Sequence, residues 1–399
     1  MPDQALTGYK VLDLTHHIAG PYCTKLLCGL GAEVVKVEKP GEGDPSRRMG
    51  PFFNDHPHPE KSLHFLHLNI KKKGITLNLK SAKGRGIFKE LLQGVDILVE
   101  NFSPRVMPGL GFDYEALATI NPGLIMTSIS NFGKTGPYRD YKALDITSLA
   151  LSGAMWANGD PAGDPLTYPG WAAQYWGGMN AFTSTLMALY YREISGEGQQ
   201  IDISIQECMG TLLENTDIRY QFGGNPHPRW GNLWAGVALW GSRPCKDGWC
   251  CVVSGTTTQQ WRALVELLGE PGLKDEKYET TGARMEYAEE IEAMAAPRLM
   301  ELTKDEIFHR GQELGAVTAP SMNAKDVVNS PQLKARDFWM EQDHPVVGRW
   351  TYPGPPVKMT ETPFEFGPAP LLGQHNQEVY GGLGYGKEDL VRLREMGVI

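Results

Sequence analysis

Basic and amide side chains follow the ends of several predicted strands, where they could bind phosphate. Lys39 opens a short Pro- and Gly-containing stretch after a predicted strand at 33–38, and Asn101 and Phe102 follow a predicted strand at 95–100. Lysine ammonium groups pair with phosphate as point charges, and open α/β sheets bind ligands at the carboxyl ends of their strands. Together these positions indicate a crevice for a nucleotide-like ligand.

A run of three lysines, Lys71 to Lys73, lies between two apolar stretches. A solvated turn is one explanation for so short a basic run, and contact with phosphate is the other. Because the run comes after the second predicted strand, we expect Lys72 and Lys73 to face the crevice and to meet the phosphates of its ligand.

Two other patterns are weaker. Gly29 and Gly31 begin a sequence like a dinucleotide-binding loop, but Val34 stands where the third glycine belongs. A proline-rich segment holds four histidines: His56, His58, His64 and His67. A loop followed by a strand explains this segment better than a zinc site, which needs fixed ligand geometry. We therefore predict no metal site.

Strand and helix patterns alternate along the first third of the chain. Apolar runs predict strands at 10–15, 33–38, 95–100 and 124–130. Such alternation is typical of a parallel α/β sheet. A breaker cluster at 223–228 marks a domain boundary, and the patterns beyond it predict a small α+β domain. We expect a large domain at 1–222, a small domain at 223–330 and a C-terminal segment at 331–399.

The composition narrows the class of protein. The chain has 399 residues, of which 41% are hydrophobic and 21% charged, and its net charge is −9. These values are typical of a globular protein. No basic stripe suggests a nucleic acid partner, no apolar run is long enough to cross a membrane, and the N-terminus has no signal-peptide pattern. We expect a cytoplasmic protein.

Longer motifs point to a family. The chain opens with a segment that resembles the start of the family III CoA-transferases, KVLDLTHHIAGPYCTKLLCGLGAEVVKVEKPGEGD. The resemblance continues in the family's order through VDILVENF, NPGLIMTSISNFGKTGPY, YREISGEGQQIDISIQECM, PAPLLGQHN and GYGKEDLVRLREMGVI. It implies a Rossmann-like parallel-sheet large domain, completed by the returning C-terminal segment, plus a small α+β domain. It also implies an interlocked dimer.

The resemblance implies that CoA, as a substrate rather than a resident cofactor, is bound by residues already noted. Lys39 stands where many members have arginine, and Arg105 could replace a family arginine that is Gly109 here. Ile18 stands where formyl-CoA transferase has glutamine. The implied CoA-binding residues are His16, Ala19, Lys39, Lys72, Lys73, Asn101, Phe102 and Arg105.

The family's catalytic residue is missing. Family transferases use an Asp whose carboxylate attacks the acyl-CoA to form a mixed anhydride, which CoA thiolate converts to an enzyme-bound thioester. Counting back from the family glycine at Gly196 places Gln174 at this position, and no Asp or Glu lies between 165 and 192. Related racemases also need a histidine before Asp145, where this chain has Leu144.

Three functions remain open. The one we favour is a silent subunit of a heteromeric CoA-transferase with an Asp-bearing homologous partner. One branch of the family has this composition and moves CoA from succinyl-CoA to (R)-benzylsuccinate in anaerobic toluene degradation. The second is a homomeric transferase with a displaced carboxylate, Asp145 or Asp164. The third is a non-enzymatic CoA-binding protein.

Aromatic residues surround the Gln174 region and would suit an aromatic acyl group. Ordinary core packing is the alternative, because large aromatics dominate buried area in most proteins. These residues are Trp156, Trp171, Tyr175 and Trp176.

Overall fold

The computed structural model describes residues 4–399, which divide into two compact units. The first unit contains residues 4–153, 168–214 and 335–399, and the second contains 154–167 and 215–334. The second unit therefore begins before the predicted boundary at 223, because most of helix α10 (Glu214–Gly223) belongs to it. It also takes in a loop from the middle of the predicted large domain.

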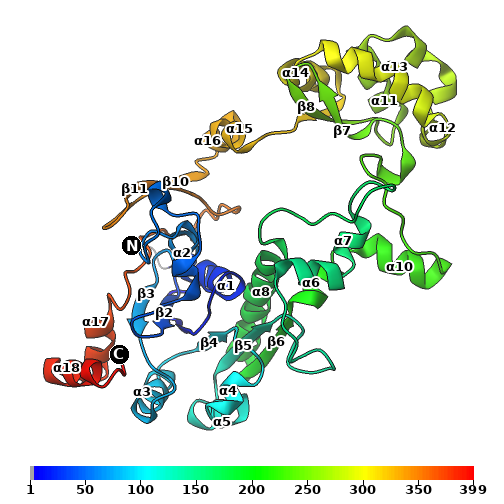
Figure 1. The fold of residues 1–399 in the computed structure, drawn as a ribbon. Helices are drawn as coiled ribbons and strands as arrows, with labels where there is room; N and C mark the ends of the chain where they lie inside the picture. Colours follow the sequence, from blue (N-terminus) through cyan, green and yellow to red (C-terminus); the bar gives the residue numbers. More distant parts are fainter. Residues whose placement is uncertain (1–3) are drawn as a thin grey trace. The chain divides into compact units, whose positions relative to one another are not determined.

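A parallel sheet forms the centre of the first unit (Figure 1). Its strands are β1 (Lys10–Asp13), β2 (Glu33–Glu38), β3 (Lys73–Thr76), β4 (Ile97–Glu100), β5 (Ile125–Ser130) and β6 (Gln199–Ser204). All neighbouring pairs are parallel and the order is β3-β2-β1-β4-β5-β6, which confirms the predicted α/β class. The chain changes direction across the sheet between β1 and β4, the point where such folds bind ligands.

Helices cover both faces of this sheet. On one face α1 (Ala19–Gly29) packs against α8 (Ala172–Ser195). This close approach needs Gly178, since a Cβ there would lie 2.4 Å from the Ala19 carbonyl oxygen. The other face buries a core with α3 (Ala82–Leu92), α5 (Tyr114–Ile120), α17 (Asn376–Gly382) and α18 (Lys387–Glu395).

The C-terminal segment completes the first unit. Tyr380 of α17 donates a hydrogen bond to the Thr76 carbonyl at 2.6 Å, and Leu393 and Val398 enter the core beneath the sheet. A hairpin of β10 (Trp339–His344) and β11 (Gly348–Pro353) precedes these helices.

Side chains that cap helix N-termini define where several helices begin. The segment predicted as a strand is helix α2 (Leu63–Leu68), and Ser62 caps it by accepting from the Phe65 amide. Periodicity cannot distinguish so short an apolar run from a strand. Asp113 caps the start of α5 by accepting from the Ala116 amide. Thr303 and Glu306 form a capping box at the start of α14 (Lys304–Leu314).

The second unit is a small α+β structure. Its antiparallel sheet of β7 (Trp240–Cys245), β8 (Gly248–Val253) and β9 (Val317–Pro320) shares a core with α11 (Thr258–Leu268), α13 (Ala288–Glu301) and α14. The remaining helices of the two units are α4 (Val106–Gly109), α6 (Asp145–Leu151), α7 (Ala154–Ala157), α9 (Ile205–Gly210), α12 (Thr281–Glu286), α15 (Ala324–Asn329) and α16 (Pro331–Ala335). Within the described chain, no helix is both long and apolar enough to span a membrane.

Candidate active site

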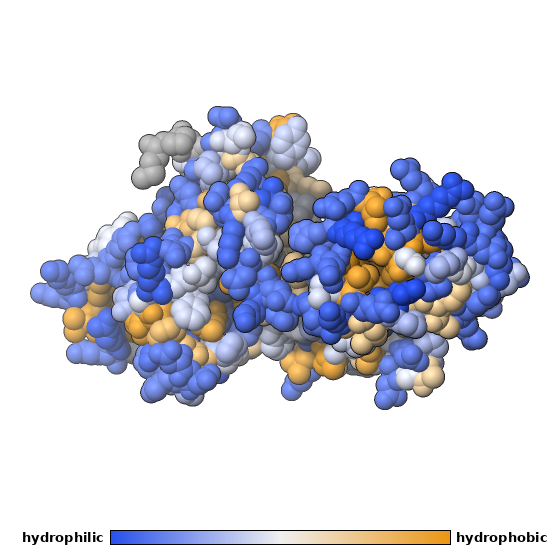
Figure 2. Space-filling view, turned by 90° about the horizontal axis from the view of Figure 1, so that it is seen from above, coloured by the Kyte–Doolittle hydropathy of each residue, from blue (hydrophilic) through white to orange (hydrophobic). Residues whose placement is uncertain are grey.

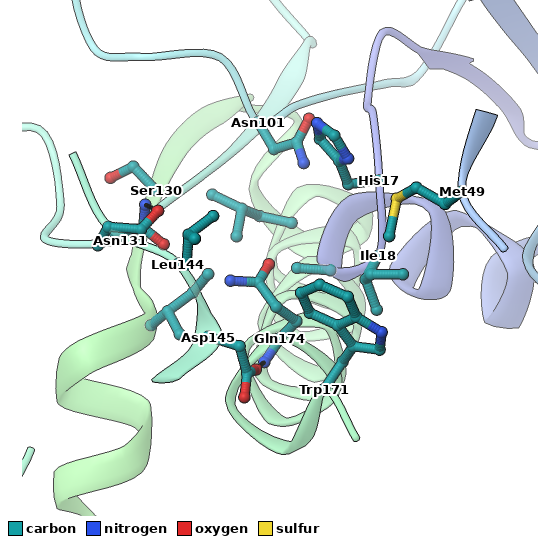
Figure 3. A pocket seen from close by; sticks show the side chains of 14 residues that line it. His17, Ile18, Met49, Asn101, Ser130, Asn131, Leu144, Asp145, Trp171 and Gln174 are labelled. Carbon is teal, nitrogen blue, oxygen red and sulfur yellow. Dashed lines mark hydrogen bonds between the residues drawn. The ribbon is translucent and has the colours of Figure 1, made fainter. Parts of the chain in front are cut away.

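A pocket of about 360 Å³ lies at the carboxyl ends of β1, β4 and β5 (Figure 3). Apolar side chains make most of its wall, among them Ile18, Met49 and Leu144. Ser130 is one of the polar lining residues, and its buried hydroxyl has no hydrogen-bond partner among the described residues. A buried polar group without a partner is costly to the folded state.

Asn101 holds the turn between β1 and α1 in place. Its Oδ1 accepts from the His16 amide at 2.7 Å, and its Nδ2 donates to the His16 carbonyl at 2.7 Å. The His16 ring packs edge-on against Phe102, with centroids 5.2 Å apart. His16 therefore braces the turn, while Ala19, at the start of α1, lines the pocket directly.

Buried charges fix the same turn from beneath. Asp13, at the end of β1, lies 3.0 Å from the Lys72 ammonium and accepts hydrogen bonds from Thr15 and Thr24. Burial alone would raise the pKa of Asp13, but Lys36 and Lys72 outweigh it and lower this pKa to about 2. The Asp13 carboxylate is thus charged at neutral pH and anchors the loop that forms one wall of the pocket.

The expectation that Lys72 and Lys73 face the crevice is wrong. The Lys72 ammonium is fully buried and lies within 3.0 Å of Asp13, Thr24, Asn69 and the Pro21 carbonyl. An ammonium has three N–H donors, so none remains for a phosphate. Lys73 begins β3, an edge strand two places from the β1–β4 switch point, and pairs there with Glu33 and Glu378.

A wider groove of about 930 Å³ shares Asn101, Ser130, Asn131, Ala143 and Leu144 with the pocket. Phe102 and Arg105 line it, as do Arg139 and Lys142, which the sequence analysis did not single out. The sequence feature that could have indicated these two residues is their position shortly after the GKTGPY motif. Lys39 lines neither cavity and lies exposed, 2.5 Å from Glu42.

Arg105 forms an ion pair with Asp140. Its Nε lies 2.8 Å from Asp140 Oδ1, and one terminal nitrogen lies 2.6 Å from Asp140 Oδ2. The Arg105 side chain is 76% exposed, and exposed ion pairs contribute little free energy. A phosphate in the groove can therefore compete with Asp140 for this guanidinium.

Gln174 lies in the first turn of α8, and its side-chain amide points into the middle of the pocket (Figure 3). The amide is half-buried. Trp171, one turn earlier, forms the neighbouring wall. An amide in this position can donate and accept hydrogen bonds, but it lacks the carboxylate needed to form an anhydride.

Asp145 is the carboxylate nearest to this position, and it caps a helix. Its Oδ1 accepts from the Gln174 backbone amide at 3.0 Å, so the side chain lies at the base of the pocket against the start of α8 (Figure 3). Burial raises the pKa of Asp145, and the backbone hydrogen bonds from Gln174 and Ala173 oppose that rise. Asp164, the other candidate, is exposed in the second unit and does not line the pocket.

The four aromatic residues near Gln174 do not form one pocket. Only Trp171 lines the cavity around Gln174. Tyr175 packs edge-on against Tyr22, and Trp176 donates to the Cys208 carbonyl at 2.8 Å. Trp156 belongs to the second unit. Of these four residues, only Trp171 can therefore contact an acyl group in this pocket.

Comparisons with known proteins give a consistent result. Residues 6–376 match CoA-transferase family III. The succinyl-CoA:(R)-benzylsuccinate CoA-transferase subunit BbsE of Thauera aromatica is 31% identical over 408 aligned positions, covering 99% of this chain and 98% of that protein. The formyl-CoA:oxalate CoA-transferase of Streptomyces coelicolor is 34% identical, with both chains fully covered. A CAIB/BAIF family protein from Brucella suis has a similar structure, with a TM-score of 0.86 and 30% identity over 96% of this chain and 100% of that one.

Proposed function

Because this chain belongs to CoA-transferase family III, we propose that it is the non-catalytic subunit of a heteromeric CoA-transferase. Its partner is a homologue that carries the family's nucleophilic Asp. The complex moves CoA between an acyl-CoA such as succinyl-CoA and a carboxylic acid. The similarity to BbsE favours (R)-benzylsuccinate as that acid.

The observation that carries this proposal is the side chain of Gln174. It points into the pocket at the carboxyl edge of the sheet, where the family resemblance puts the nucleophile. The anhydride and the enzyme thioester are both acyl derivatives of a carboxyl group, so an amide cannot form either. A homomeric enzyme using Asp145 is disfavoured, because that carboxylate is buried and bonded to the N-terminus of α8.

The two cavities suggest how CoA lies in the subunit. Arg105, Arg139 and Lys142 line the groove and offer positive charge to the CoA phosphates. Asn101 borders both cavities, so the thioester end can pass from the groove into the pocket. In this arrangement His16, Ala19 and Phe102 remain part of the proposed site, and Lys72 and Lys73 do not.

An exposed apolar stripe on α8 supports the proposal that a partner subunit packs against this chain, as in the interlocked dimer that the family resemblance implies. Met187, Tyr190 and Ile194 follow one another at helical spacing on α8, and their side chains are 66%, 72% and 71% exposed. Figure 2 shows apolar patches on one mostly hydrophilic face of the molecule. A contiguous exposed apolar patch on a protein often marks a site where another protein binds.

Native mass spectrometry of the complex purified from its source tests the proposal. We expect this chain in a stoichiometric assembly with an Asp-bearing homologue, and transfer from succinyl-CoA to (R)-benzylsuccinate only when both chains are present. Oxalate and D-citramalate serve as alternative acids. A homo-oligomer of this chain that transfers CoA alone would contradict the proposed division of labour.

A further inference from the structure

A second pocket, of about 250 Å³, lies beside the α1–α8 helix pair and has no role in the proposed transfer reaction. Its residues all belong to the first unit. Lys25 and His67 supply its nitrogen atoms, and the wall includes Tyr22, Tyr175, Phe364 and Phe366. The pocket thus places a basic side chain within a largely aromatic wall.

Lys25 is a buried cation without a counter-charge. The residue is only 5% exposed, and its ammonium lies 3.3 Å from both ring nitrogens of His67. No carboxylate pairs with it anywhere in residues 4–399, and the charged group that acts on it is Lys72, of the same sign. Because a buried charge is stable only when paired, Lys25 can carry its full charge in this pocket only when an anion joins it there.

The pKa values of the pocket's side chains reflect the absence of a counter-charge. Burial, followed by repulsion from Lys72, lowers the pKa of Lys25 to about 7. Burial, followed by the charge of Lys25, lowers the pKa of His67 to about 3, so its ring is neutral. Burial raises the pKa of Tyr175 to about 12 and also raises that of Tyr22, so both phenols keep their protons and can donate.

The aromatic wall is fixed before any ligand arrives. The Phe364 ring lies against Gly29, where a Cβ would come within 1.8 Å of the ring. The next residue, Glu365, accepts from Lys71 in an ion pair and donates its amide to the Gly29 carbonyl at 2.7 Å. The Tyr22 and Tyr175 rings, also in the wall, pack edge-on with their centroids 4.8 Å apart. Such a preformed site costs little ordering entropy on binding.

We propose that this pocket binds a small aromatic carboxylate. The carboxylate pairs with the Lys25 ammonium and accepts from the neighbouring phenols, while the ring lies against Phe364 and Phe366. A carboxylate supplies the missing charge, and a flat ring suits the aromatic wall. The site is separate from the Gln174 pocket, so its occupancy does not depend on the proposed transferase role.

Binding of benzoate by calorimetry tests this proposal, with benzamide as the uncharged analogue. We expect one benzoate per chain and at least about tenfold weaker binding of benzamide, because a charge-assisted contact is lost. The Lys25→Met variant should lose a similar factor, whereas Lys274→Met, at an exposed lysine, should bind like the parent protein. Equal binding of benzamide, or undiminished binding by Lys25→Met, would overturn the proposal.

A second measurement on the unaltered protein does not depend on the variant folding. Reductive methylation at neutral pH, read by peptide mass spectrometry, should modify Lys25 and should slow markedly when benzoate is present. The exposed Lys274 provides the internal control and should react at the same rate with or without benzoate. If benzoate binds but leaves methylation of Lys25 unchanged, the ligand occupies another site and the proposal fails.

Discussion

Gln174 resembles a carboxylate in size but not in reactivity. Its oxygen can accept a hydrogen bond in the pocket, yet it cannot become an acyl anhydride and then a thioester. Beside it, Asp145 keeps a carboxylate whose Oδ1 is occupied by the first turn of α8. Under the silent-subunit proposal, the chain therefore has a pocket at the family's site but lacks the carboxylate that reacts.

The Gln174→Ala variant should therefore retain most of the complex's activity. No bond to Gln174 forms in the transition state, so we expect kcat/KM for CoA transfer to fall by less than about tenfold. The matched change, Asn for the nucleophilic Asp of the partner subunit, should lower kcat by roughly a thousandfold or more. Steady-state kinetics of the two complexes decide this, and a comparable collapse with Gln174→Ala would show that this subunit takes part in the chemistry.

At the scale of elements, the turn between β1 and α1 forms one wall of the candidate site and is held by buried charge. Lys36 donates to the Thr15 carbonyl at 2.7 Å, and Lys72, the residue before β3, pairs with Asp13. Replacing Lys72 by Met should lower the free energy of unfolding by about 3 kcal/mol, because it leaves buried Asp13 with one fewer cation. Replacing half-exposed Lys73 by Met should cost less than about 1 kcal/mol.

Urea unfolding of the Lys72→Met and Lys73→Met variants, together with CoA binding, checks this assignment. We expect a stability loss for the first and little change for the second. A Lys72→Met protein of unchanged stability that had lost CoA affinity would restore the phosphate-binding role assigned from the sequence.

The buried Asp13 carboxylate in this turn predicts that the folded protein loses stability in acid. The pKa of Asp13 is 3.8 when unperturbed and about 2 in the folded protein. Its ionic contribution to stability is therefore fully present above pH 3.8 and is lost as the pH falls through about 2. In the Asp13→Asn variant the urea midpoint should change less with pH over this interval than in the parent. Parallel pH profiles for the two proteins would argue against the ionic network.

At the scale of the whole molecule, much of the architecture was predictable. Alternating apolar runs indicated the parallel sheet, and long motifs indicated the family. The burial of Lys72 was not predictable, because a lysine triplet has the same sequence whether it faces water or a buried Asp13. The contact of Lys25 with His67 joins α1 to α2, and no local sequence pattern predicts a contact between these two helices. The helix at 63–68 was missed because its serine cap, not its periodicity, defines it.

The division of labour between subunits is tested most directly by trapping the covalent intermediate. The purified complex is incubated with succinyl-CoA and treated with hydroxylamine, and both chains are examined by peptide mass spectrometry. We predict a hydroxamate on the partner's Asp alone, because hydroxylamine displaces succinate or CoA only from a carboxyl group that has been converted to the anhydride or the enzyme thioester. A hydroxamate on a carboxylate of this chain, Asp145 or Asp164 above all, would contradict the silent-subunit proposal and make this chain the catalyst.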